Sequence, residues 1–246
     1  MSVGLSPLQL FIFICALAVL RVGLSLRPIA ASARGKSARW IVREYLDAFI
    51  VAGAAALFII TFIARTHYIP SESMEPTLHV HDVILTNEIE YRLRAPQHDD
   101  VAIFEPPIES ASDFIKRVIG TPGDTLSIRH GTVFRNGADL SEPYIAAKPA
   151  YDLEIKNYGI VVDGIPLDPA SANIPPRAQW QAPDRIPDGY YFMMGDNRNN
   201  SDDSHIWGFA QSHGTFASGP KKGRRAGFTG HAAILFWPLD RLRVVK

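Results

Sequence analysis

The chain has 246 residues, enough for one sizeable domain with an anchor or for two small domains, and 47% of them are hydrophobic. Its 25 basic and 25 acidic side chains balance, which gives no electrostatic argument for nucleic acid as a partner. Cys15 is the only cysteine, so no disulfide within the chain supports the fold.

Two apolar segments near the start of the chain predict membrane spans. Residues 46–64 contain one charge, Asp47, and as a helix rising about 1.5 Å per residue they nearly cross a hydrocarbon core of about 30 Å. The first predicted span lies within residues 1–26. Its apolar run, Leu8 to Leu20, reaches that length only if Arg21 extends to the interface or the helix continues to Leu26. A buried helix of a soluble protein and a cleaved signal peptide are the alternatives. The signal peptide is disfavoured because no basic residue precedes Arg21.

The segment between the predicted spans, residues 27–45, is basic, and Glu44 is its only acid. By the positive-inside rule this loop is cytoplasmic, so everything after Arg65 lies on the outer side of the membrane. The basic residues of the loop are Arg27, Arg34, Lys36, Arg39 and Arg43.

The rest of the chain, residues 65–246, predicts a mostly β domain. Short β-rich runs closed by Pro or Gly, and a hairpin with His130 and Gly131 at its turn, predict antiparallel strands. No convincing stretch of helical periodicity follows Arg65. The fold we expect is therefore two N-terminal transmembrane helices followed by an extracytoplasmic, antiparallel β-rich domain. Its predicted strands are residues 100–107, 114–120, 125–137, 190–197 and 231–239.

Two parts of this domain show little periodicity. Residues 138–188 contain eight prolines, which predicts an irregular insertion, a small subdomain or an extended flap. Residues 211–230 predict a flexible loop with a basic cluster, which is either solvated or in contact with anionic lipid headgroups. The cluster consists of Lys221, Lys222, Arg224 and Arg225.

The segment that follows the second predicted span carries serines between two prolines. Pro70 and Pro76 exclude a regular helix and favour an extended, turned backbone. Serines in such a segment usually form hydrogen bonds with the local backbone, which is the simplest interpretation of Ser71 and Ser73 taken alone.

Lys116 lies inside the predicted strand 114–120. Because a strand alternates its faces, Lys116 shares a side with Phe114 and Val118, which are both apolar. The amine either extends to water or is buried, and the strand pattern alone favours extension. Burial would lower the pKa from about 10.4, and a neutral amine can accept the proton of a serine hydroxyl.

Residues 195–208 form a polar loop bounded by glycines. A calcium loop is excluded because Arg198, Ser201 and Trp207 stand at positions that need ligands or a turn glycine. Zinc is disfavoured as well, because no third ligand accompanies the histidines of residues 79–82. A loop that braces an active site is the better interpretation.

Three of these segments together, residues 70–78, 116–124 and 195–208, resemble the three hallmark boxes of bacterial type I signal peptidases. Their order, their spacing and the preceding span also match that family. The resemblance covers roughly residues 46–137 and 190–209. It implies a membrane-anchored serine endopeptidase with a Ser/Lys dyad that needs no metal or cofactor. Its partners would be the lipid bilayer and signal-peptide-bearing preproteins, cut at the outer face of the bacterial inner membrane.

Carried over position by position, the resemblance implies that Ser73 is the nucleophile and Lys116 the general base. Ser71 would complete an oxyanion hole with the Ser73 backbone amide. Ser201 would orient the Lys116 amine, and Asp203 would brace the loop. Shallow apolar pockets would admit the small side chains of an Ala-x-Ala site and exclude larger ones. The implied walls of these pockets are Ile69, Met74, Leu78 and Ile115.

Two departures from the family pattern concern the polar loop. Asn199 and His205 stand where the family usually has aspartate and arginine, so the resemblance does not define the ionic partner of Asp203. Arg117 can still pair with Asp196. Two alternatives also stay open: a dedicated maturation peptidase of the same family, with a single substrate such as a pilin, and a non-catalytic, membrane-anchored peptide-binding β-domain.

Overall fold

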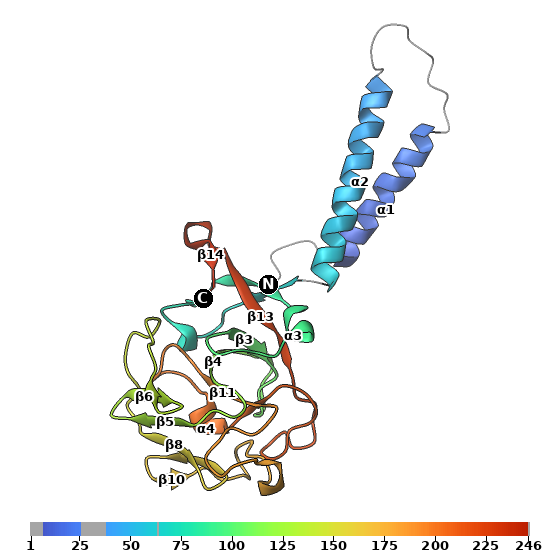
Figure 1. Ribbon diagram of the computed structural model, residues 1–246. Coiled ribbons are helices and arrows are strands. Elements are labelled where there is room, and N and C mark those ends of the chain that lie inside the picture. Colours follow the sequence, from blue (N-terminus) through green and yellow to red (C-terminus); the bar gives the residue numbers. More distant parts are fainter. Residues whose placement is uncertain (1–6, 26–37, 63, 246) are drawn as a thin grey trace. The chain divides into compact units, whose positions relative to one another are not determined.

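The structure is a computed structural model that describes residues 7–25, 38–62 and 64–245 (Figure 1). The chain forms two compact units, Met1–Arg65 and Thr66–Lys246. Each unit has its own internal packing, and the second contains every element that bears on the predicted chemistry.

The first unit consists of two helices, α1 (Pro7–Ser25) and α2 (Ala38–Phe62), which pack against each other. Arg21 of α1 donates two hydrogen bonds to the Asp47 carboxylate of α2, with N–O distances of 2.7 and 3.0 Å. Most of the predicted loop 27–45 lies outside the described residues. Among the residues that the structure does describe, no helix combines the length and the apolar character that a membrane span needs.

The second unit is built on an antiparallel sheet of eight strands. The strand order is β1-β2-β13-β3-β4-β11-β12, with β14 paired to β13. Because β13 lies between β2 and β3, the end of the chain completes the centre of the sheet (Figure 1). The strands are β1 (Ala64–Tyr68), β2 (Val83–Asn87), β3 (Val101–Phe104), β4 (Phe114–Gly120), β11 (Tyr190–Met194), β12 (Ala210–Gln211), β13 (Phe228–Trp237) and β14 (Arg243–Val244).

A second antiparallel sheet has the strand order β10-β9-β8-β5-β6-β7. Its central hairpin, β5–β6, turns at His130 and Gly131 as predicted, and both residues have positive φ angles. The strands are β5 (Leu126–Arg129), β6 (Thr132–Arg135), β7 (Ala138–Asp139), β8 (Leu153–Lys156), β9 (Gly159–Val162) and β10 (Ile165–Pro166).

Region 138–188 is therefore more ordered than predicted, because it supplies β7 to β10. Leu153, Ile155 and Ile160 point from β8 and β9 into the core. These strands are two to four residues long, which is too short for alternation to be recognised in the sequence. The same buried cluster contains Leu126 of the second sheet and Phe192 of the first, so one core joins the two sheets.

The remaining helical elements are single turns, and the prediction of a mostly β domain is confirmed. The turn α4 packs its Trp207 fully buried against Phe104 of β3. The turns are η1 (Glu72–Met74), α3 (Glu90–Leu93), η2 (Arg177–Gln179), α4 (Ser204–Trp207) and η3 (Leu239–Arg241).

The basic cluster at residues 221–225 is not uniformly solvated. Lys221 is buried and its amine contacts the Glu105 carboxylate, so neither interpretation of the cluster holds for this residue. Arg224 pairs with Glu109 over 3.1 Å at the surface. The acidic partners of Lys221 and Arg224 lie more than 100 residues away in sequence. Composition alone does not reveal such pairs.

Candidate active site

Ser73 lies in a short turn that its neighbours anchor in the core. The turn is η1 (Glu72–Met74), and it is followed by extended backbone. Met74 and Leu78 are buried, and the Leu78 amide donates to the Met74 carbonyl over 2.8 Å. The turn therefore holds Ser73 half-buried, and the Ser71 hydroxyl donates to Ser73 Oγ over 3.3 Å.

Lys116 lies within β4, which is flanked on its two sides by β3 and β11. Only 4% of Lys116 is exposed, and its Nζ lies 5.7 Å from the centroid of the Phe114 ring. The expectation from the strand pattern, that the amine extends to water, is wrong. The cause is tertiary: segments distant in sequence cover this face of β4, and alternation within one strand cannot indicate them.

Burial lowers the pKa of Lys116 to about 8, because desolvation disfavours the charged amine. The carboxylates of Asp203, Asp202 and Asp196 oppose this change by favouring the charged form. At pH 7 roughly a tenth of the molecules then carry a neutral amine at this position. The Lys116 amine can therefore accept a proton near neutral pH, whereas an exposed lysine is almost fully protonated there.

Loop 195–203 packs directly against Ser73. The Asn197 amide donates to the Ser73 carbonyl over 3.1 Å. A Cβ atom at Gly195 would lie 2.4 Å from that same carbonyl oxygen and 2.2 Å from Ser201 Oγ. Ser201 Oγ is buried and makes no hydrogen bond within the described part of the chain. Glycine at position 195 is thus what lets Ser201 and Ser73 approach each other.

Asp196 joins the three segments that the sequence singled out. Arg117 donates to its two carboxylate oxygens over 2.8 and 2.6 Å, and both side chains are almost completely buried. The Thr77 hydroxyl donates to the same carboxylate over 2.5 Å. Arg117 also donates to the Asp99 carbonyl over 2.9 Å and lies 3.9 Å from the centroid of the Tyr144 ring. The Arg117–Asp196 pair that the sequence allowed is present.

The partner of Asp203 is His205. The Asp203 carboxylate accepts from the Gly195 amide over 3.1 Å and from His205 Nδ1 over 2.5 Å. The His205 ring stacks on Tyr151, with centroids 4.3 Å apart and planes 12° apart. Asp203 is fully buried at the start of α4, so it connects the loop that carries Ser201 to the helical turn behind it.

A cleft of about 960 Å³ runs over these groups. Ser71, Ser73, Lys116 and Ser201 line it together with the apolar side chains of Ile69, Met74 and Ile115. Leu78 and Asp203 do not line it, because both are completely buried. Lys116 Nζ makes no hydrogen bond with Ser73 or Ser201 within the described chain. The three side chains therefore line the same cleft without being hydrogen-bonded through the amine.

Sequence reasoning missed several residues at the cleft and behind it. The Thr77 hydroxyl bond and the Tyr151 ring gave no local signal, because their partners lie 119 and 54 positions away. No group of three or more potential metal ligands comes together among the residues described. The further lining residues include Tyr68, Phe114, Asn200, Asp202, His205 and Ile206.

Comparison with known proteins identifies relatives of this chain. The family described as "Signal peptidase, peptidase S26" matches residues 42–217. "Probable signal peptidase I-2" of Synechocystis sp. is 37% identical over 198 residues, which cover 78% of this chain and 72% of the relative. "Probable signal peptidase I-1" of the same organism is 34% identical over 207 residues, covering 81% and 85%. "Signal peptidase I" of Leptolyngbya laminosa is 35% identical over 194 residues, covering 76% and 75%.

The close approach at Gly195 predicts the effect of a single added methyl group. We expect Gly195→Ala to lower the free energy of unfolding by about 1–3 kcal/mol, because the new Cβ must displace the Ser73 backbone and Ser201. Gly159→Ala is the matched control, since a Cβ there meets only one atom, at 3.9 Å. Denaturation of the full chain in detergent, followed by tryptophan fluorescence, measures both. Equal stability of the two variants would contradict the packing described here.

Proposed function

This chain belongs to the signal peptidase family, peptidase S26, and we propose how it removes signal peptides from exported proteins. In this proposal the chain is a serine endopeptidase in which Ser73 is the nucleophile and Lys116 the general base. The observation that carries the proposal is the burial of Lys116 at a cleft that Ser73 also lines. The relatives are named signal peptidase I, which favours neither a single-substrate maturation peptidase nor a non-catalytic binding domain.

In the proposed mechanism the neutral Lys116 amine accepts the hydroxyl proton of Ser73 as Ser73 Oγ attacks the scissile carbonyl. The resulting tetrahedral oxyanion is stabilised by the Ser71 hydroxyl and the Ser73 amide. Lys116 then gives its proton to the leaving amine, and an acyl-enzyme forms at Ser73. Water hydrolyses this ester with Lys116 again as the base. The 3.3 Å contact between the two serine hydroxyls supports the position of Ser71.

We assign Ser201 to the orientation of the Lys116 amine. Its hydroxyl is buried, lines the same cleft and makes no hydrogen bond within the described chain. A buried hydroxyl without a hydrogen-bond partner costs about 1–3 kcal/mol. A hydrogen bond between Ser201 and the Lys116 amine during the reaction would remove that cost. Asp203 holds the loop through the Gly195 amide and acts from behind the cleft.

The substrate pocket is formed by Ile69, Met74 and Ile115, which line the cleft beside the dyad. The resemblance placed Leu78 with these three residues. Leu78 belongs to the same buried cluster as Met74 but does not line the cleft. A wall of close-packed aliphatic side chains admits alanine and excludes bulky residues by steric overlap. This favours substrates with Ala-x-Ala sites.

We further propose that both N-terminal segments anchor the chain in the bacterial inner membrane, with the catalytic unit on the outer side. The basic loop 27–45 supports this orientation. The Arg21–Asp47 pair supports insertion, because two opposite charges joined by two hydrogen bonds cost less in an apolar medium than either charge alone. Co-anchoring would bring the cleft to substrates that are themselves held in the bilayer.

The dyad is tested by cleavage of a peptide with an Ala-x-Ala site. We expect the full chain in detergent to cut after the second alanine, and Ser73→Ala and Lys116→Met each to lose at least about 1,000-fold in kcat/KM, since the two residues act as a unit. Arg129→Met is a control at an exposed position. Cleavage that survives Lys116→Met in a folded variant would overturn the assignment of the base.

The lowered pKa of Lys116 predicts the pH dependence. Only the neutral amine acts as base, so kcat/KM should rise as the pH increases through about 8 and level off above it. Asp202→Asn should move this midpoint to lower pH, because the Asp202 carboxylate favours the charged amine. Asp188→Asn, an exposed acid outside the cleft, is the control. A midpoint that does not change in Asp202→Asn would contradict the electrostatic account.

The single cysteine allows a direct test of membrane topology. In a Cys15→Ser background, Ser110→Cys reports on a partly exposed position of the catalytic unit and Ser37→Cys on the predicted cytoplasmic loop. We expect an impermeant maleimide to label Ser110→Cys in spheroplasts, and to label Ser37→Cys only after the membrane is permeabilised. Labelling of both before permeabilisation, or recovery of the chain in the soluble fraction, would contradict the proposed anchoring.

A further inference from the structure

Residues 142–151, which we call the brace, contact the polar loop, and the brace residues are not among those that line the cleft. Glu142 accepts a hydrogen bond of 2.5 Å from Arg198, and both side chains are buried. Arg198 donates in turn to the Gly195 carbonyl over 3.1 Å. This buried ion pair ties the brace to the backbone of the residue that packs against Ser73.

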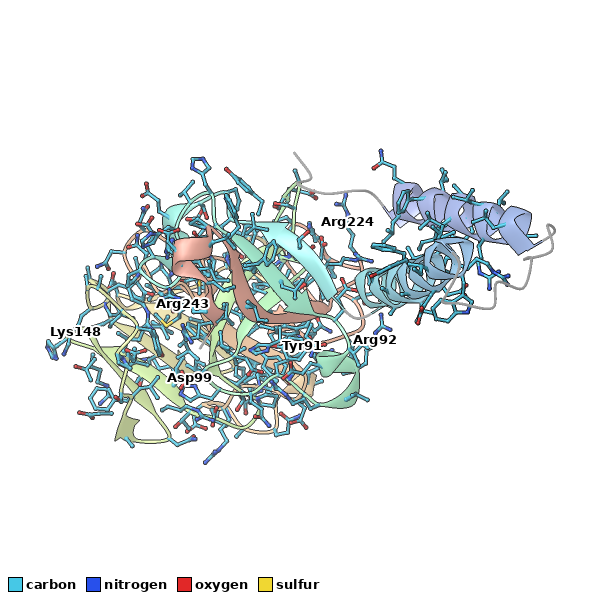
Figure 2. All side chains as sticks on the ribbon, turned by 90° about the horizontal axis from the view of Figure 1, so that it is seen from above. Tyr91, Arg92, Asp99, Lys148, Arg224 and Arg243 are labelled. Atoms are coloured by element: carbon cyan, nitrogen blue, oxygen red, sulfur yellow. The ribbon has the colours of Figure 1, made fainter. Side chains whose placement is uncertain are left out.

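Asn199 makes a second connection to the brace. Its side-chain oxygen accepts from the Ala150 amide over 2.8 Å, and its side-chain nitrogen donates to the Lys148 carbonyl over 2.9 Å. The Lys148 side chain extends to the periphery of the catalytic unit in Figure 2, so this residue holds the loop through its backbone. The neutral amide at position 199 satisfies one donor and one acceptor, which a carboxylate cannot do.

The third connection is the stack of Tyr151 on His205, 4.3 Å between centroids. The Tyr151 hydroxyl is buried and makes no hydrogen bond within the part of the chain that is described. The contact of Tyr151 with the polar loop is therefore made by its aromatic ring and not by its hydroxyl. The Tyr151 ring keeps the His205 ring in the orientation in which Nδ1 lies 2.5 Å from the Asp203 carboxylate.

We propose that Tyr151 is a positioning residue, whose ring holds His205 against Asp203 and thereby fixes the loop that carries Ser201. The whole brace has this role, and Tyr151 is the part of it that contacts His205, which lines the cleft. The expected effect on catalysis rests on the proposed function. The mechanical part of the proposal, that Tyr151 orders the polar loop, does not depend on it. Region 138–188 thus supports the active site as well as supplying four strands of the second sheet.

The chain of contacts has an electrostatic consequence for Lys116. The charged groups around it are Asp196, Asp202 and Asp203 on the loop, with Glu72 and Asp113 on the lining of the cleft. His205 is the partner of Asp203, the carboxylate with the largest effect on Lys116. Without the stack, the His205 ring leaves Asp203, and the carboxylate keeps only the Gly195 and His205 backbone amides as donors. More of its negative charge then acts on Lys116 and raises the pKa of that amine.

The test compares Tyr151→Ala and Tyr151→Phe with Tyr158→Ala. Tyr158 lies in the same region and packs its ring on Trp180 and Arg177, so it reports general destabilisation of that region. We expect Tyr151→Ala to lower kcat by about 10- to 100-fold with a smaller change in KM, because misplacement by a fraction of an ångström weakens catalysis more than binding. The midpoint of its pH profile should move to higher pH. Tyr151→Phe should recover most of kcat.

Hydrogen exchange of the loop provides a readout that is independent of cleavage. The Gly195 amide donates to Asp203, so its exchange should become faster in Tyr151→Ala and stay slow in Tyr151→Phe and Tyr158→Ala. If the wild type cuts no peptide, the proposed function fails and exchange alone decides the mechanical part. Unchanged exchange in Tyr151→Ala, or an equal increase in Tyr158→Ala, would overturn the positioning role. So would an unchanged pH midpoint in an active Tyr151→Ala enzyme.

Discussion

The buried carboxylate of Asp196 is the constraint on which the arrangement of the catalytic unit depends. Arg117 and Thr77 both donate to it, so segment 70–78, β4 and the polar loop meet at one group. Burying two opposite charges is costly, and only close hydrogen-bonded geometry offsets that cost. Loss of one partner from such a pair typically costs about 3–5 kcal/mol. Any arrangement of the three segments that separates them therefore leaves a charge without compensation.

The strand period of two connects this pair to the chemistry. Adjacent residues of a strand point to opposite faces, so Arg117 reaches Asp196 and Tyr144 while Lys116 faces the cleft. The ion pair fixes the register of the strand, and the fixed strand keeps the neighbouring amine out of water. The desolvation that results is what brings the pKa of Lys116 to about 8, against the field of the nearby aspartates. The buried ion pair and the buried amine thus come from consecutive residues of one strand.

The polar loop is held by contacts with two other segments, the turn that carries Ser73 and the brace. Gly195 and Asn197 contact the Ser73 backbone. The brace supplies a buried ion pair, an amide bridge and an aromatic stack. His205 and Asn199, which depart from the usual family pattern, are both used in these contacts. A region with little sequence periodicity therefore completes the support of a loop that is recognisable in the sequence.

The sequence by itself predicted Ser73 and Lys116 as the catalytic pair only through the resemblance of three segments to the signal peptidase boxes, because each residue taken alone favoured an ordinary structural role. It also determined the mostly β fold, and the hairpin at His130 and Gly131. Only the tertiary structure decided the burial of Lys116, the position of Leu78 beneath the cleft, the strands of region 138–188 and the partner of Asp203. Each of these depends on contacts between segments far apart in the chain. Periodicity and composition report only on neighbours in sequence, so burial and pairing across such distances are outside their reach.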